Sequence, residues 1–434
     1  MIQVFKKLVL VAFIGSMAIY LSACTQDVVD HDLEVVNGTE TYEGMYTGTL
    51  EDGKPIGQAK YVVKIDDTSN WVYNGPFTEG SFSGEGTVEN FPCKVKIGVK
   101  NDDGVYSGVV KDGVIDGKGD YNSSLGWHYV GSFENGEIKG EGTIENYSYP
   151  LLYENQTLEG TYNGAVLDGI PNGEGKIEVK AGDVELSYDG NWTDGKLSGE
   201  GNLKSNSYTV PFTDTTRTGE YEGATLDGKA SGEGVFTATN SNGDKYTYTG
   251  EFLNGTFDGI GTIDFESDDI TDFTGHFTKG ENTPTQSELL KYIGTVKDFV
   301  SYGVSDTSVK FIDAHNDLFM AESEDALEAF INSEVTLNEL YKTPNEHNDE
   351  IIKVSTKKII QIRQEDIYKN TITWFIVEDT SGNRMFVICN GKLPEVNKND
   401  KVTVYGLPID LCSYKNSFNG SVSAFVIYGA VVKK

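Results

Sequence analysis

The feature that most constrains the fold of this chain is a spacing of glycines and aromatic residues that recurs many times. In residues 129–146, YVGSFENGEIKGEGTIEN, it reads Tyr-x-Gly-x-Phe-x-x-Gly-x-x-x-Gly-x-Gly. Alignment on the Tyr-x-Gly pair gives eight units and a degenerate ninth, which start at Tyr46, Tyr73, Tyr106, Tyr129, Tyr162, Tyr188, Tyr221, Tyr248 and Phe273. Such self-similarity indicates a repeat architecture in which each unit packs on its neighbours.

Two kinds of unit alternate along the repeat. The odd-numbered units turn on Asp-Gly and carry a non-aromatic residue at the fifth position, namely Leu50, Val110, Val166 or Thr225. The even-numbered units carry an aromatic residue there, namely Phe77, Phe133, Trp192 or Phe252. The complete repeat is therefore a pair of units, which indicates tandem duplication of a two-hairpin module.

Within residues 129–146, the dipeptide Asn135-Gly136 predicts a hairpin with a type I′ turn, because both central residues of that turn need a positive φ. Uninterrupted pairing places Glu134 opposite Glu137, Phe133 opposite Ile138, Gly131 opposite Gly140, and Tyr129 opposite Gly142. Side chains alternate across a strand. One face then carries Tyr129, Gly131, Phe133, Ile138, Gly140 and Gly142, and the other carries Val130, Ser132, Glu134, Glu137, Lys139 and Glu141. We expect the glycines to make room for aromatic rings that lie on the sheet.

Regularly spaced glycines also occur in nucleotide-binding loops, where they lie between a strand and the N-terminus of a helix. Here no helical pattern follows any unit, and Lys139 and Lys229 occur without the Gly-Lys-Ser/Thr arrangement. The glycines therefore indicate close packing of side chains on the sheet and tight turns between its strands. We expect no nucleotide and no other cofactor.

The pattern resembles the MORN repeat, and the resemblance covers about residues 42–280. The even units match well, whereas the odd units lack the aromatic residue at the fifth position and the first unit has Ala59 in place of its last glycine. The resemblance implies an elongated, single-layer antiparallel sheet of stacked hairpins over residues 42–284. Members of this family have been linked to phospholipid headgroups and to protein–protein scaffolding. Because the units here are acidic and lack basic clusters, scaffolding is the family role that we expect for this chain.

The chain is strongly acidic, with 35 Lys and Arg against 67 Asp and Glu and a net charge of −32. Residues 24–284 carry −29 of this charge, whereas residues 350–434 carry +4. An acidic surface repels the phosphates of nucleic acids and of anionic lipids. We therefore expect no nucleic-acid partner.

The N-terminus has the pattern of a lipoprotein signal. Lys6 and Lys7 precede the apolar run LVLVAFIGSMAIY, residues 8–20, and Leu21-Ser22-Ala23-Cys24 follows it. The run is too short to span a bilayer and is typical of a signal peptide. A small-residue stretch that ends at Cys resembles the bacterial lipobox.

The lipobox resemblance implies that residues 1–23 are removed and that Cys24 receives diacylglycerol. The protein would then be anchored to the cell membrane, on its extracytoplasmic face. We expect the polar residues 24–41 to form a tether. The alternative is an ordinary secretory signal with a chance cysteine.

The composition shifts after Thr285. Apolar residues take a helical spacing over residues 287–299, 309–319 and 322–341, so we expect a helical connector over residues 285–349. From Ile351 onward the pattern predicts strands at residues 351–364, 371–379, 383–390, 401–408 and 421–432. Five strands with these turns resemble an OB-fold barrel, which we expect over residues 350–434.

OB barrels bind their ligands across the second and third strands. Trp374, Arg384 and Phe386 lie on the corresponding strands and are candidate ligand-binding residues, unless they belong to the core. The net charge of +4 is too weak to favour nucleic acid. Outside the cell, a sugar or peptide ligand fits better.

We expect neither a catalytic residue nor a strong metal site. The five histidines are isolated, and no Gly-x-Ser-x-Gly motif occurs. The densest acidic stretch, Glu266, Asp268, Asp269 and Asp272, lacks the spacing of an EF-hand and is either a solvated loop or a weak calcium site. Cys93, Cys389 and Cys412 form no C-x-x-C motif, and the last two are either a disulfide pair or buried thiols.

Together these patterns predict a mainly β, membrane-anchored binding or scaffold protein whose repeat array displays an OB-like module to a protein or glycan partner at the cell surface. A cell-wall or polysaccharide-binding adhesin that uses exposed Tyr and Trp is the first alternative. Trp71, Trp127 and Trp192 lie within or beside the repeats, where we expect them to pack, with a sugar-stacking surface as the alternative. An enzyme with a site in the C-terminal domain is the second alternative. Exposed aromatic rows would favour sugar binding, and a charged outer face would favour a protein partner.

Overall fold

The structure is a computed structural model that describes residues 24–212, 215–296, 300–320, 322–415 and 421–434. These residues form a first, antiparallel sheet of twenty strands and a second, mixed sheet of six strands. The chain divides into two compact units. One unit holds the residues up to Tyr149 together with Thr161–Gly175, and the other holds Pro150–Gly160 with Lys176–Lys434. The mainly β class predicted from the sequence is confirmed.

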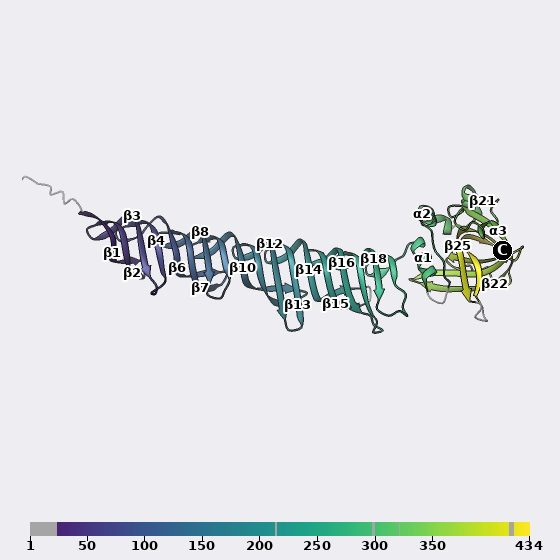
Figure 1. The fold of residues 1–434 in the computed structure, drawn as a ribbon, viewed down its shortest axis with the longest axis horizontal. Coiled ribbons are helices and arrows are strands. Elements are labelled where there is room, and N and C mark those ends of the chain that lie inside the picture. Colours follow the sequence, from purple (N-terminus) through teal and green to yellow (C-terminus); the bar gives the residue numbers. More distant parts are fainter. Residues whose placement is uncertain (1–23, 213–214, 297–299, 321, 416–420) are drawn as a thin grey trace, which may run out of the picture. The chain divides into compact units, whose positions relative to one another are not determined.

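The strands of the first sheet follow one another in chain order and pair largely as hairpins (Figure 1). Its first ten strands are β1 (Thr25–Asn37), β2 (Glu40–Glu51), β3 (Lys54–Lys64), β4 (Asn70–Thr78), β5 (Ser81–Phe82), β6 (Glu85–Ile97), β7 (Lys100–Lys111), β8 (Val114–Ser123), β9 (His128–Glu134) and β10 (Glu137–Tyr153). The other ten are β11 (Gln156–Leu167), β12 (Ile170–Ala181), β13 (Val184–Thr193), β14 (Lys196–Pro211), β15 (Thr216–Leu226), β16 (Lys229–Thr239), β17 (Lys245–Leu253), β18 (Thr256–Phe265), β19 (Phe273–Thr278) and β20 (Glu281–Asn282).

A buried tyrosine opens each of the first eight repeat units. Its hydroxyl donates to the carbonyl oxygen three residues later, over 2.6–3.1 Å, in every one of these units. The ring lies over the glycines of its own hairpin, and a Cβ added at Gly131 or Gly142 would overlap the ring of Tyr129. The glycines therefore make room for aromatic rings, as the sequence predicts.

The predicted register of the Tyr129 hairpin is correct beside the turn and wrong beyond it. Asn135 and Gly136 have φ values of 49° and 81°, and Phe133 pairs with Ile138 as predicted. However, Gly131 lies opposite Gly142 and Tyr129 opposite Ile144, because a bulge between Ile138 and Gly142 shifts the pairing by two residues.

Gly140 lies in that bulge, with a φ of +78°. A Cβ added to it would contact Ser132 on the polar face, so the prediction that Gly140 faces the rings is wrong. The N–H of Gly140 donates to the carboxylate of Asp168 at 2.7 Å, and the N–H of Asp168 donates back to the Gly140 carbonyl at 3.0 Å. The bulge is therefore held by the Asp-Gly turn of the next unit.

The same reciprocal contact recurs between residues 28 positions apart. It joins Gly84 to Asp112 and Gly199 to Asp227, with N–H to carboxylate distances of 2.7 Å in both cases. Cys24 takes the place of the bulge glycine in a fourth example, where its N–H lies 3.3 Å from the carboxylate of Asp52. These contacts explain why the odd units turn on Asp-Gly.

Residues 24–41, which we expected to form a tether, are mostly part of the sheet. Strand β1 pairs antiparallel with β2 from Thr25 opposite Glu51 to Asn37 opposite Glu40. The hydroxyl of Tyr61 donates to the Leu33 carbonyl at 2.9 Å. Val35 is the only buried side chain of β1, so main-chain pairing holds this strand in the sheet. Because the composition of β1 is polar, its sequence pattern does not indicate a strand.

The second sheet contains a closed ring of five strands, β22 (Ile351–Ile367), β23 (Asn370–Asp379), β24 (Arg384–Asn390), β26 (Ser421–Lys433) and β25 (Thr403–Lys415). Neighbours in this order pair antiparallel except β24 and β26, which are parallel, and β25 closes the ring onto β22. The short strand β21 (Ile331–Asn332) adds in parallel to β22. The five predicted strands all form.

The helices before the ring are α1 (Gln286–Thr295), α2 (Asp306–Ala314), the 3-10 helices η1 (Asn316–Met320) and η2 (Glu324–Phe330), and α3 (Leu337–Leu340). The long helix predicted over residues 322–341 is wrong. Asn332 and Thr336 accept hydrogen bonds from the N–H groups of Glu334 and Glu339, so they cap turns instead of continuing a helix.

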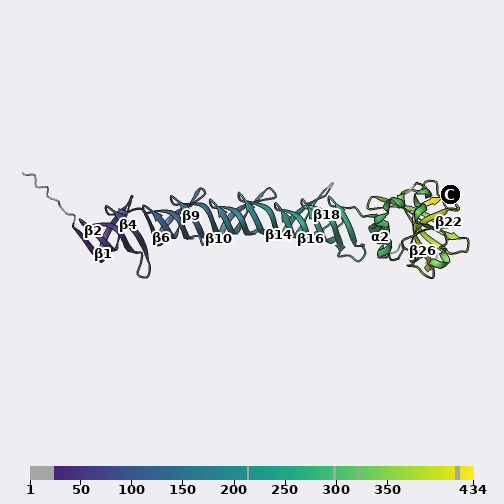
Figure 2. The ribbon, with the colours of Figure 1, turned by 90° about the horizontal axis from the view of Figure 1, so that it is seen from above.

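These helices form part of the C-terminal core and are more than a connector. Figure 2 shows α2 beside the strands of the ring. Leu289, Leu290, Ile293 and Ile312 belong to one buried cluster with Trp374, Phe386 and Tyr428 of the ring. Along β23 the residues of this cluster alternate with those of a second cluster, to which Phe375 and Val377 belong. Leu337 and Leu340 of α3 belong to that second cluster. Helices α1 and α2 thus pack against one face of β23, and α3 packs against the residues of the other face.

Candidate interaction surfaces

The polar face of the first sheet is charged and carries open grooves. In the first unit a groove of about 810 Å³ is lined by Lys118, Asp120 and Glu141, among others. Val130, which is 45% exposed, also lines it. This face bears the side chains that the sequence assigns to the polar side of the hairpins.

A second groove, of about 730 Å³, crosses the polar face of strands β12 to β16 in the second unit. Its charged lining residues are Glu178, Lys180, Glu185, Lys204, Glu220 and Glu222. Lys204 and Glu222 form an ion pair at 2.8 Å, with about two thirds of each side chain exposed. A hydrogen bond from Lys176 lowers the pKa of Glu178, which keeps its carboxylate ionised. The carboxylates outnumber the lysines, so this groove, called the unit-two groove below, suits a cationic surface.

The tryptophan rings of the repeats are buried. Trp71, Trp127 and Trp192 are only 3%, 5% and 2% exposed. Among the described residues, the large hydrophobic side chains that are exposed are aliphatic or Met, and none is aromatic. Tyr42, Tyr147 and Tyr149 are half-buried, so the described part of the chain shows no row of fully exposed aromatic rings.

The three candidate ligand-binding residues of the ring do not form one solvent-exposed site. Trp374 and Phe386 stack on each other with ring centroids 5.2 Å apart, and they are 6% and 2% exposed. Both belong to the cluster that the helices cover. Arg384 contacts Glu378 at 3.3 Å and also contacts Tyr414, which packs against this cluster. Trp374 and Phe386 thus have the core role that we considered as the alternative.

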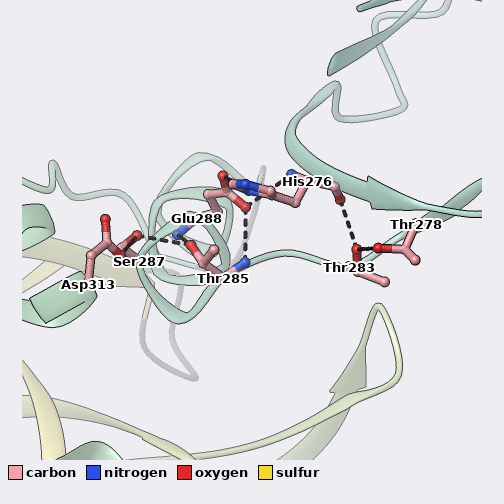
Figure 3. A network of polar contacts seen from close by, with 7 residues as sticks. All are labelled: His276, Thr278, Thr283, Thr285, Ser287, Glu288 and Asp313. Carbon is pink, nitrogen blue, oxygen red and sulfur yellow. Dashed lines mark hydrogen bonds and ion pairs between the residues drawn. The ribbon is translucent and has the colours of Figure 1, made fainter. Parts of the chain in front are cut away.

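The last repeat unit and the first helix are joined by a network of polar contacts (Figure 3). Glu288 of α1 accepts hydrogen bonds from the backbone N–H of His276 on β19 at 3.1 Å and from its Nδ1 at 2.6 Å. The same carboxylate accepts from the N–H of Thr285 at 2.9 Å, which completes a capping box at the start of α1. The carbonyl of His276 accepts from the N–H of Thr283 at 2.8 Å.

Aromatic packing and an ion pair reinforce this junction. Phe273 opens the degenerate ninth unit, and its ring centroid lies 5.9 Å from that of Tyr292 and 4.7 Å from that of Tyr368. Lys369 forms an ion pair with Glu281. The tyrosine of the other units is therefore replaced by a phenylalanine where the sheet meets the C-terminal domain.

The acidic stretch Glu266–Asp272 does not gather into a metal site. Glu266 pairs with Lys245, and Asp272 accepts from the N–H of Phe265 at 2.9 Å. Across the described ranges, no group of three or more His, Cys, Asp or Glu side chains is placed to hold a metal ion. Asp268 and Asp269 lie in the loop between β18 and β19, where the N–H of Asp269 donates to the Ser267 hydroxyl at 3.3 Å.

The cysteines beyond Cys24 are free thiols. Cys389 and Cys412 are buried and unpaired with each other, and burial raises the pKa of each thiol to about 12. Burial also raises the pKa of Cys93 to about 12. Thiols held in this protonated form are poor nucleophiles.

The signal peptide predicted over residues 1–23 lies outside the described residues. Cys24 is the first described residue and is exposed. None of the helices in the described part of the chain is long and apolar enough to cross a membrane.

Comparison with known families agrees with the repeat pattern. The sequence model of the MORN repeat matches residues 106–124, 129–146, 188–210, 221–243 and 248–270. The chain therefore contains MORN repeats across residues 106–270. No curated protein sequence matches the chain.

The units outside these matches have the same structure. Tyr46, Tyr73 and Tyr162 each donate to the carbonyl three residues later, as in the matched units. The repeated hairpins thus extend before the matched segments and also occupy the interval between residues 146 and 188. The junction at His276 and Glu288 was not predicted from the sequence, although Thr285-x-x-Glu288 is a capping-box pattern that signals the start of α1.

Proposed function

We propose that this protein is a lipid-anchored scaffold on the extracytoplasmic face of the membrane, which holds a protein partner on the polar face of its MORN repeats. The observation that carries the proposal is the division of the sheet into two faces. The tyrosines that open the first eight units and the three repeat tryptophans are buried, while the polar face carries charged grooves such as the unit-two groove. This arrangement favours a protein partner over a polysaccharide that stacks on aromatic rings.

The acidic balance of residues 24–284 favours a cationic partner surface. Complementary charge speeds the encounter and selects the partner. It also opposes binding to anionic lipid headgroups, so the repeats themselves do not serve as the membrane contact. The proposal includes no catalytic step.

Cys24 is the proposed point of lipid attachment. The main chain of Cys24 is bound to Asp52 in the same way that the bulge glycines are bound in later units. An acyl chain on Cys24 would thus hold the first hairpin close to the bilayer, without an intervening tether. Two acyl chains suffice for stable anchoring.

We propose that the C-terminal ring is an OB-like module. In sequence it lies at the opposite end of the chain from the anchor at Cys24. Its strand order and its single parallel pair, β24 with β26, support that assignment. Because α1 and α2 pack against the cluster that contains Trp374 and Phe386, we propose that the ring does not bind a ligand there.

Photo-crosslinking on intact cells tests the scaffold role. A photoreactive residue is placed at Ser187, which lines the unit-two groove, and in a control protein at the exposed Lys357 on β22. We expect a discrete protein adduct from position 187 that resists glycosidase treatment and is absent at position 357. An adduct removed by glycosidases, or identical adducts from both positions, would contradict the proposal.

A further inference from the structure

The N-terminal edge of the first sheet is open in the described part of the chain. Strand β1 pairs with β2, and residues 24–212 supply no second ladder for it. At the end of the strand the Ser81 hydroxyl of β5 donates to the Val36 carbonyl at 2.9 Å, so the open edge is the part of β1 that precedes Val36. A strand edge of this kind presents unpaired N–H and C=O groups that can template another strand.

The other end of the same sheet is closed. There the N–H of His276 is bound by the Glu288 side chain and its carbonyl by the N–H of Thr283. The start of α1 and the segment before it therefore protect β19, the last full strand, which is one of the usual ways of covering an edge. The contrast singles out β1 as the accessible edge.

Edge strands that must stay free usually carry Lys or Pro as protection. The stretch from Cys24 to Gly53 contains neither. Its acidic residues on β1 are Asp27, Asp30, Asp32 and Glu34. Beside them a shallow groove of about 500 Å³ is lined by Asp32, Glu43, Asp66 and Asp67, with Lys64 as its one basic residue.

The two faces of β1 differ in character. Leu33 and Val35 lie opposite Gly44 and Tyr42, on the side where Tyr61 reaches the Leu33 carbonyl. Asp32 and Glu34 alternate with them and point to the polar face, beside Met45 and Glu43. A strand added to β1 would need apolar residues on one face and cationic residues on the other.

We propose that β1 binds an extended segment of a partner protein in which cationic and apolar residues alternate, by strand addition. A second copy of this chain fits poorly, because pairing β1 with itself would bring its acidic side chains close together. This inference does not rest on the unit-two groove. Either binding proposal can therefore be contradicted without affecting the other.

The test uses the detergent-solubilised full chain and a fluorescent peptide of alternating Lys and Val, measured by anisotropy. A second peptide carries N-methyl groups along one edge of its backbone, which removes the N–H donors and keeps the charge. The variant Asp32→Lys/Glu34→Lys is compared with Glu233→Lys/Glu251→Lys, which makes the same charge change on exposed residues of β16 and β17.

We expect the N-methylated peptide and the Asp32→Lys/Glu34→Lys variant each to weaken binding about tenfold or more. The control variant should bind the Lys/Val peptide as the wild type does. Equal binding of the two peptides, or equal losses in both variants, would show that the charge of the whole chain attracts the peptide and would overturn the proposal. Concentration-dependent dimers that the peptide dissociates would show that a second copy occupies the edge, and would overturn it as well.

Discussion

The carboxylate of Glu288 binds both the backbone N–H and the imidazole Nδ1 of His276, at 3.1 and 2.6 Å. Since an ionised carboxylate can only accept, Nδ1 carries the proton in this contact. One side chain thus caps helix α1 and closes the last full strand of the sheet. The junction is a specific interface between a repeat unit and the domain that follows it.

Replacing Glu288 by Ala should loosen this junction. The N–H groups of His276 and Thr285 would lose their acceptor, and we expect the free energy of unfolding to fall by about 2 kcal/mol. Denaturant unfolding followed by amide hydrogen exchange at His276 measures both effects. Lys291→Ala, on the exposed side of the same helix, is the control and should change little. Unchanged exchange at His276 in the Glu288→Ala protein would show that the contact is not structural.

Gly131→Val tests the packing of rings against bare backbone. Any Cβ at this position would overlap the Tyr129 ring and approach Gly142, which lies directly opposite. We expect a loss of about 3 kcal/mol through overpacking. Thr143→Val places the same side chain at an exposed position of the same hairpin, where the native residue is already β-branched, and should be nearly neutral. If the two substitutions had equal effects, the ring would not lie where we describe it.

Much of the array could be predicted because its determinants are local. The Asn135-Gly136 turn and the alternation of Tyr129, Gly131 and Phe133 define one hairpin and its two faces. The register beyond Ile138 could not be predicted, because the bulge at Gly140 depends on Asp168, which is 28 residues further along the chain. A local pattern contains no information on such a contact until the neighbouring unit is placed.

The C-terminal domain shows the same limit. Its five strands were predicted from alternation and turns, but the burial of Trp374 and Phe386 depends on helices that come earlier in the chain. Alternation along β23 and β24 assigns these residues to one face without showing what covers it. The polar strand β1 was missed for the related reason that its pairing is made by the main chain.

The buried tyrosines predict alkaline unfolding. Burial raises the pKa of Tyr73, Tyr129 and Tyr188 to about 12, from an ordinary value near 10. The folded state therefore holds more protons than the unfolded state between these values. The protonated tyrosines therefore contribute fully to the free energy of unfolding below about pH 10, and this contribution is lost as the pH rises toward about 12.

Tyrosinate absorbance and far-ultraviolet circular dichroism, recorded together, check this prediction. We expect the repeat tyrosines to ionise together with the loss of strand signal above about pH 10. Ionisation of all tyrosines near pH 10 with an intact strand signal would mean that the hydroxyls are open to solvent.

Cys24→Ser tests the proposed anchor. The contacts of Cys24 with Asp52 are made by the main chain and the Asp52 side chain, so the substitution should leave the fold unchanged. We expect the variant to move from the membrane fraction to the soluble fraction after cell disruption. Cys93→Ser should remain in the membrane fraction, and a Cys24→Ser protein that also remained there would exclude lipid attachment at this residue.

The most direct test of the scaffold proposal combines the crosslinker at Ser187 with charge reversal in the unit-two groove. Glu220→Lys/Glu222→Lys removes two exposed carboxylates from the groove and places a lysine opposite Lys204. The matched control, Glu346→Lys/Glu395→Lys, makes the same change on exposed residues of the C-terminal domain. We predict that the protein adduct at position 187 falls about tenfold in the groove variant and is unchanged in the control. An adduct that persists in the groove variant, or falls equally in both, would contradict partner binding on the charged face of the repeats.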